Sequence, residues 1–422
     1  MDNHPNIENE NGEQQEAQAD EQEQIDAAAA AAETKRRHLK IDSVLARKGK
    51  FPLRNRKKIN VLIEEFLVKL EDDIHDMFFE NELTDADTYD ALDSDRDTEE
   101  EVETALRFFP EVLSRRKDVY AGRFRYPIQE LALAHDVQNG KYQCNVKTVL
   151  FIPIVARLAI EFDLFEEDER GGLLLGFGRY GDNTLHQLML TDQTIEGDNR
   201  EQQHEAVDDK FLQVLIQLRK LGLLKKEDIQ RYDLLHCLCG EDYFAEKRLR
   251  FLVEWDPNAL TQTDRFGHVP LDYMVRSIQG FESVFEYGIR YFPKKKGISL
   301  LFHTSNSWLT PFHYACKHFG YEKVKKIIED TLGRYSSTPI NSADALLSAA
   351  IDENVHLYGV YFLLRRDPDM LQKLLSSSPS STSMAVADCD INININTNCI
   401  NDTTDEVNSR KEKDRKRKRC ID

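Results

Sequence analysis

The segment Thr310-Pro-Phe-His-Tyr-Ala-Cys316 decides the fold, because altered copies of it recur through the middle of the chain. The other copies are Tyr126–Ala132, Asn183–Met189, Asp233–Cys239, Val269–Val275 and the weaker Ala345–Ala350. Their second positions are 57, 50, 36, 41 and 35 residues apart. Recurrence at such spacings predicts a repeat protein in which each copy marks one structural unit.

Each residue type in the segment suits the start of a short helix. Pro311 fits the first helical position, where its missing N–H is not needed, and Thr310 can cap that helix. His313, at the fourth position, is expected to hydrogen-bond locally and to hold neighbouring turns together. Gly122, Gly181 and Gly267 are expected to supply the positive φ of the connecting hairpins.

A second element accompanies the copies, namely an apolar helix that ends in a proline. It occurs at Leu106–Pro110, Leu249–Pro257, Ile289–Pro293 and Tyr361–Pro368. Proline is an expected stop, because it lacks an N–H and disfavours helix in the residue before it. Three of the four have a leucine three residues beyond the proline, at Leu113, Leu260 and Leu371.

These two elements resemble those of ankyrin repeats. The Thr310–Ala315 core is similar to the Thr-Pro-Leu-His-x-Ala signature, and Asp264–Leu271 resembles the hairpin that precedes it. The resemblance covers about 270 residues, is best over 231–332, and looks most like the divergent, insertion-bearing ankyrin proteins of microalgae. It implies an all-α, ankyrin-like α-solenoid of about six irregular helix-turn-helix repeats over 104–375, which binds protein partners through hairpin tips and the concave helix face.

The net charge of −19 is concentrated outside the repeats. Residues 1–34 hold ten acids and no base, and 35–58 hold eleven bases and one acid, so 1–58 is expected to be a disordered tail, acidic and then basic. Residues 59–103 are expected to form a capping helix and an acidic linker. Residues 376–422 are expected to be a disordered low-complexity tail with a basic cluster.

The expected capping helix spans 59–80. Its apolar side would consist of Val61, Leu62, Phe66, Leu67, Leu70 and Ile74. A helix of this kind could cover the exposed end of the first repeat, since terminal repeats need a polar outer face.

No motif for catalysis, for a metal or for a cofactor outweighs a structural interpretation. Gly176–Gly181 matches G-x-G-x-x-G, but no βαβ pattern surrounds it, so a glycine-rich hairpin is favoured over a nucleotide site. Cys237 and Cys239 are interpreted as packing residues, because no second metal-ligand pair accompanies them. The recurring His186, His236 and His313 would be one repeat apart and are interpreted as structural. We therefore expect no enzyme, no cofactor and no bound metal.

The candidate partner-binding residues are three Arg–aromatic pairs at expected hairpin tips. They are Arg123, Phe124, Arg179, Tyr180, Arg265 and Phe266. Arginine and aromatic residues are enriched in binding hot spots. The alternative is that the aromatic rings stack between adjacent hairpins and the arginines remain solvated.

A basic cluster near the end of the chain is typical of a nuclear localisation signal. It consists of Arg415, Lys416, Arg417, Lys418 and Arg419. No window of about 18 apolar residues indicates a membrane span. We expect a non-catalytic protein–protein interaction scaffold in the nucleus, or alternatively in the cytoplasm. The alternative function is nucleic-acid or chromatin association through 35–58 and 410–419; the partner and the oligomeric state stay open.

Overall fold

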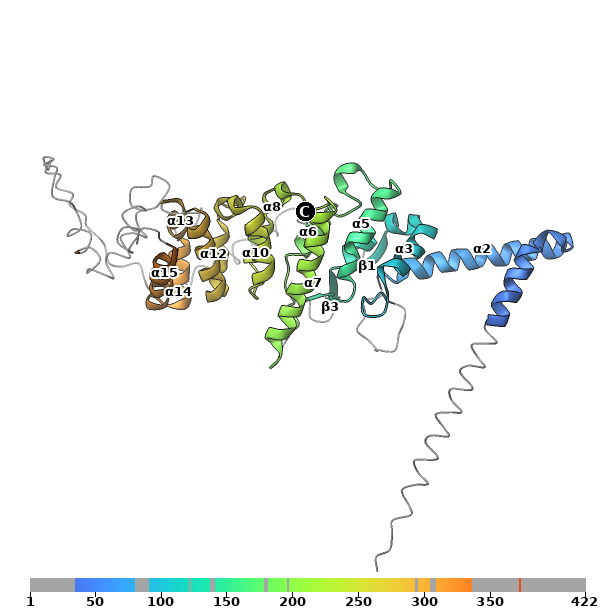
Figure 1. Cartoon of the computed structure of the whole chain (residues 1–422), viewed down its shortest axis with the longest axis horizontal. Helices are drawn as coiled ribbons and strands as arrows, with labels where there is room; N and C mark the ends of the chain where they lie inside the picture. The colour runs from blue at the N-terminus through green and yellow to red at the C-terminus, as the bar shows by residue number, and fades with distance from the viewer. Residues whose placement is uncertain are drawn as a thin grey trace, which may run out of the picture. The chain divides into compact units, whose positions relative to one another are not determined.

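The computed structural model describes residues 35–79, 91–120, 123–136, 141–177, 181–195, 197–292, 295–303, 309–335 and 372. The chain divides into two compact units, 1–374 and 375–422, and every element described below lies in the first. The described residues are mostly helical (Figure 1), which confirms the all-α prediction in its coarse form. The sixth repeat copy at Ala345–Ala350 lies outside the described residues.

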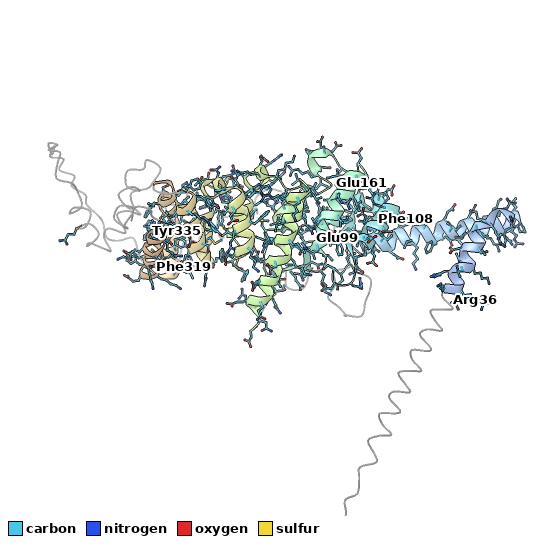
Figure 2. The ribbon with its side chains drawn as sticks, viewed as in Figure 1. Arg36, Glu99, Phe108, Glu161, Phe319 and Tyr335 are labelled. Carbon is cyan, nitrogen blue, oxygen red and sulfur yellow. The ribbon has the colours of Figure 1, made fainter. Side chains whose placement is uncertain are left out.

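Each of the five described copies of the segment forms a short helix, and a longer helix follows it in the chain. The five pairs are α4 (Pro127–Glu130) with α5 (Ile152–Glu161), α6 (Thr184–Gln187) with α7 (Arg200–Lys220), α9 (Leu234–Cys239) with α10 (Glu246–Trp255), α11 (Pro270–Tyr273) with α12 (Ile278–Tyr291), and α14 (Pro311–Phe319) with α15 (Tyr321–Tyr335). The ends of α14 and α15, Phe319 and Tyr335, are labelled in Figure 2.

Shorter elements lie before, within and between these pairs. The helical ones are η2 (Pro110–Ser114), η3 (Val149–Phe151), η4 (Glu167–Glu169), α8 (Lys226–Arg231), η5 (Pro257–Thr261), η6 (Met274–Arg276), α13 (Lys295–Ser299) and η7 (Leu300–Phe302). Two antiparallel hairpins, β1 (Lys117–Tyr120) with β2 (Arg123–Arg125) and β3 (Leu133–Asp136) with β4 (Lys141–Cys144), are strands that the all-α prediction missed. The second hairpin lies between α4 and α5 and lengthens the first repeat spacing.

The helix pairs pack mainly on pairs that are close in the sequence. Among the short helices, α6 contacts α9, α9 contacts α11, and α11 contacts α14. Among the long helices, α5 contacts α7, α7 contacts α10, and α12 contacts α15. Gln187 Nε2 also donates to the carbonyl of Gln129 at 2.8 Å, which joins α6 to α4. The apolar side chains between these helices form one continuous buried cluster.

The helix starts follow the chemistry expected of the repeated segment. Proline occupies the first turn of α4, α11 and α14. Thr310 Oγ1 accepts the backbone N–H of His313 at 3.3 Å, and Asn183 Oδ1 accepts that of His186 at 3.2 Å. Gly181 and Gly267 adopt φ of 74° and 80°. The predicted cap at Thr310 and the predicted positive φ values at Gly181 and Gly267 are therefore confirmed, and Asn183 caps α6 in the same way. Gly122 lies outside the described residues.

The proline stops have a second role. Helices α3 (Glu99–Phe108) and α10 end just before Pro110 and Pro257, which begin η2 and η5. In each 3₁₀ turn the leucine three residues beyond the proline is buried, with Leu113 at 2% and Leu260 at 0% exposure. The proline therefore turns the chain, and the leucine that follows anchors the turned segment in the core.

The N-terminal region differs from the prediction. Residues 35–46 are helical, η1 spans Lys48–Lys50, and α2 spans Leu53–Asp76. The prediction of a disordered tail is thus wrong for 35–58, while 1–34 lie outside the described residues. The predicted helix start at 59 is also too late, because Pro52 sets the start of α2.

Only the last turn of α2 joins the helical units. Ile74 and Phe78 are buried, whereas Leu62 and Phe66 are 64% and 61% exposed. Asp72 pairs with Arg115 at 2.6 Å. The helix that covers α5 is instead α3, through the buried Val102 and Leu106 and the pair Arg107–Glu161 at 2.6 Å. Figure 2 labels the ends of α3, Glu99 and Phe108, next to Glu161.

Candidate binding site beside the first hairpin

A cavity of about 210 Å³ opens beside β2. Three of its lining residues, Glu130, Gln187 and Cys237, occupy the fifth position of three successive copies of the repeated segment. They come from α4, α6 and α9. Equivalent positions of three copies therefore meet at one surface hollow, and the insertions between the copies do not interrupt this alignment.

Glu130 is the buried acid of the cavity. Its side chain is 9% exposed, and its Oε1 lies 3.4 Å from Nε of Arg125. Burial raises the pKa of Glu130 to about 7, and the charge of Arg125 opposes this rise. The guanidinium of Arg125 also lies 4.1 Å from the ring centroid of Phe177. Arg125 is thus held between a carboxyl group and an aromatic face.

Arg123 is the available cation at the rim. It is exposed, and no acidic side chain among the described residues pairs with it. Asp182, also exposed, lines the same cavity beneath the antiparallel bridge that joins it to Phe177. His186 lines it as well, and burial lowers the pKa of its imidazole. Nδ1 of His186 lies 3.1 Å from the backbone nitrogen of Asn183 and 2.9 Å from Oδ1 of the same residue, so the ring is fixed to the start of α6.

The rest of the lining is apolar. Val119, Leu133, Phe177 and Leu190 contribute to it. The volume of about 210 Å³ is suited to one large apolar side chain rather than to a cofactor. The site can therefore accept an apolar group and, through Arg123, an adjacent anionic group.

The structure separates the predicted contact residues. Arg123 lines the cavity, whereas Phe124, its neighbour on β2, points away from it and is 59% exposed. Arg265 does not line the cavity, and its guanidinium lies 4.7 Å above the ring of Phe266. Phe124 and Phe266 are both exposed, so neither ring is buried between hairpins. Arg179 and Tyr180 lie outside the described residues, as do Arg415, Lys416, Arg417, Lys418 and Arg419.

The other sequence motifs also have definite positions. Phe177 and Asp182 form an antiparallel bridge directly before α6, which is the geometry of a hairpin rather than of a strand-to-helix nucleotide loop. Cys237 and Cys239 are free thiols whose pKa values are raised by burial. Among the described residues, no three His, Cys, Asp or Glu side chains are grouped to hold a metal.

Sequence reasoning missed Arg125 and Glu130. The sequence did contain a signal for Glu130. It is a charged residue at the fifth position of its copy, where the later copies have Gln187, Cys237 and two tyrosines. A charged residue in a position that is otherwise uncharged marks a local requirement. Its partner, Arg125, was not inferred, because only Arg123 and Phe124 were assigned to the tip of the hairpin expected there.

No family model matches the chain, and no curated protein or solved structure is significantly similar to it. Within the described part of the chain, no helix is both long enough and apolar enough to span a membrane.

Proposed function

We propose that this protein is a non-catalytic interaction scaffold, built as an ankyrin-like solenoid, that binds a segment of a partner protein at the cavity beside β2. The observation that carries the proposal is the meeting of Glu130, Gln187 and Cys237, equivalent residues of three successive copies, at one hollow. Repeat proteins that stack in register present such equivalent positions along a continuous binding face.

The lining chemistry defines the partner segment. Val119, Leu133 and Leu190 favour an apolar side chain, which would give the buried anchor typical of binding hot spots. Arg123 favours a carboxylate next to that side chain, since a guanidinium binds carboxylates with two parallel hydrogen bonds. The expected ligand is an acidic peptide with one large aliphatic or aromatic residue.

The test is selection of peptides on the full-length protein, followed by affinity measurements with the enriched sequences. Arg123→Glu should weaken binding by at least about tenfold, because it places like charges together. The matched control is Arg265→Glu, which makes the same charge change at another predicted contact. Enriched peptides that bind both variants as tightly as the wild type would remove the cavity from the proposal.

A second function is favoured by one observation. Residues 35–46 and the start of α2 are helical and exposed, and 35–58 carry eleven bases and one acid. Such a surface can neutralise phosphates, so nucleic-acid association is the alternative proposal. Salt-dependent binding to DNA or RNA that disappears on deleting 35–58 and 410–419 would support it.

We propose a nuclear location on the basis of residues 415–419 alone. Replacing these five residues by alanine in a fluorescent fusion should move the protein from the nucleus to the cytoplasm. An unchanged distribution would leave the cluster without a targeting role.

A further inference from the structure

Helix α2 carries an apolar stripe that the described chain leaves largely uncovered. Its residues recur at steps of three and four and therefore lie on one side of the helix. They are Ile59, Leu62, Ile63, Phe66, Leu67, Leu70 and Ile74. Only Ile74 is buried, whereas Leu62, Phe66 and Leu67 are 64%, 61% and 43% exposed.

The fold itself supplies little to cover this stripe. The main described partners of α2 are η1 and η2, which contact its two ends. The last turn is fixed by the pairs Asp72–Arg115 at 2.6 Å and Asp76–Lys117 at 3.0 Å. Figure 1 shows the helix running outward from that attachment. Its middle turns therefore present contiguous apolar surface to solvent, which is a mark of an interaction site.

The charges along α2 identify the occupant. Residues 53–58 contain four bases and no acid, whereas 64–76 contain six acids and one base. A second α2 in the antiparallel direction would place each basic end beside an acidic end. A parallel arrangement would place like charges together at both ends, which is unfavourable.

We propose that two copies of this chain associate through antiparallel pairing of their α2 helices. The apolar stripes form the seam, with Leu62 and Phe66 near its centre. About this centre, Asn55 lies opposite Asp73 of the partner subunit, and both positions are at the edge of the apolar stripe. The interface is separate from the cavity beside β2, so a test of dimer formation does not depend on the proposed function.

Nucleic acid is a poorer occupant of this stripe. The acidic second half of α2 would repel phosphates, and an apolar stripe has no role in contacting a phosphate backbone. The remaining alternative is within the chain, because the helical residues 35–46 also expose Leu39, Ile41 and Leu45. If residues 35–46 covered the stripe, the protein would be a monomer. The oligomeric state therefore distinguishes this arrangement from the proposed pairing of two chains.

The first experiment is sedimentation velocity on the full-length protein. The wild type should be a dimer, and Phe66→Glu should weaken self-association by at least about tenfold, because it places a charge in an apolar seam. The matched control is Val68→Glu. Val68 is 60% exposed on the opposite side of the helix, so this variant should remain a dimer. Both positions are exposed in the single chain, so both variants should remain folded, which far-UV circular dichroism checks.

The second experiment tests the direction of pairing. An equal mixture of Asn55→Cys and Asp73→Cys chains should form a disulfide-linked dimer under mild oxidation, beyond the level seen with the wild type. Each variant alone should not. Cross-linking of Asn55→Cys with itself would show parallel pairing and overturn the antiparallel arrangement. A wild type that stays monomeric throughout the micromolar range would overturn the proposal altogether.

Discussion

His236 shows what a recurring residue does in this chain. Its Nε2 lies 3.1 Å from the carbonyl oxygens of both Gln262 and His268, so one ring N–H reaches the hairpin of the next repeat. Burial lowers the pKa of His236, although the nearby Asp233 and Asp264 oppose this effect. The neutral ring is therefore the form that the folded chain prefers, and the residue acts as a structural link between repeats.

Replacing His236 by alanine should lower the free energy of unfolding by about 1–3 kcal/mol, because the partly buried carbonyl of Gln262 loses this donor and that of His268 keeps only the backbone N–H of Asp264. His236→Gln keeps an N–H in a similar place and should recover part of the loss. Because the folded pKa lies below the unfolded one, the contribution of His236 is full above about pH 6.5 and is lost as pH falls below it. Urea unfolding at pH 7.5 and pH 5.5 measures both effects. Equal stability of His236→Ala and the wild type at pH 7.5 would contradict this role.

Glu130 gives the opposite pH dependence. Its folded pKa of about 7 exceeds its ordinary value of 4.5, so the folded state binds its proton more tightly. The stability gained this way is full below about pH 4.5, falls as pH rises to about 7, and is absent above. Glu130→Gln should remove this loss, which amounts to at most roughly 1.4 kcal/mol per pH unit. Denaturant unfolding from pH 4.5 to pH 8 tests this; an unchanged slope in the variant would contradict it.

At the scale of elements, one buried ion pair ties three helical segments together. Arg248 of α10 is 1% exposed, and its Nε donates to Asp208 of α7 at 2.7 Å. Its Nη1 donates to the carbonyls of Leu188 and Leu190, just beyond α6, at 2.7 and 2.9 Å. Because these groups satisfy the guanidinium, the charge can be buried between two consecutive helix pairs.

The loss of unfolding free energy from the two single variants of this pair should not be additive. Arg248→Met removes the counter-charge of Asp208, which keeps only the backbone N–H groups of residues 247 and 248 as donors, and it takes the guanidinium from two carbonyls, so it should cost about 3–5 kcal/mol. The double variant Arg248→Met, Asp208→Leu should cost clearly less than the sum of the two single changes. Guanidinium unfolding of the four chains measures this coupling. Additive losses would show that the two side chains act independently.

For the whole molecule, the important feature is that packing is mainly between neighbours. The helix pairs contact the preceding and following pairs, and α14 and α15 contact α11 and α12. In an array of this kind, stability is approximately a sum of unit terms and nearest-neighbour terms. A defect in one pair should therefore spread to the adjacent pair and fade beyond it.

Leu332→Ala tests this expectation. Leu332 is buried in α15, and its truncation should cost about 2–5 kcal/mol locally. Hydrogen exchange followed by mass spectrometry should show faster exchange in α14 and α15, a smaller change in α12, and none in α3 and α5. Uniform acceleration through all described helices would indicate a single cooperative unit instead.

Local chemistry could be predicted from the sequence, and insertions could not. The caps at Thr310 and Asn183 and the stops at Pro110 and Pro257 depend on neighbouring residues, so the pattern contains them. The hairpin β3–β4 interrupts the repeat pattern between α4 and α5, and nothing in that pattern specifies it. At the hairpin before α4, only the Arg–aromatic pair at the tip was predicted as a contact, so Arg125 and Glu130 were missed. The apolar stripe of α2 was recognised, but periodicity alone does not say whether the chain covers it.

The reaction rates of the free thiols of Cys144 and Cys237 should report how the folded chain protects them from solvent. Burial raises the pKa of Cys144 and of Cys237 to about 12, so very little thiolate exists at neutral pH while the units are closed. Cys144 is buried, so reagents should modify it at the rate at which its surroundings open, whereas Cys237 is half-buried and lines the cavity, where reagents can reach it in the folded chain. Mass spectrometry of iodoacetamide-labelled protein should find both cysteines modified much more slowly than in the unfolded chain. Peptide bound in the cavity should slow Cys237 further and leave Cys144 less affected.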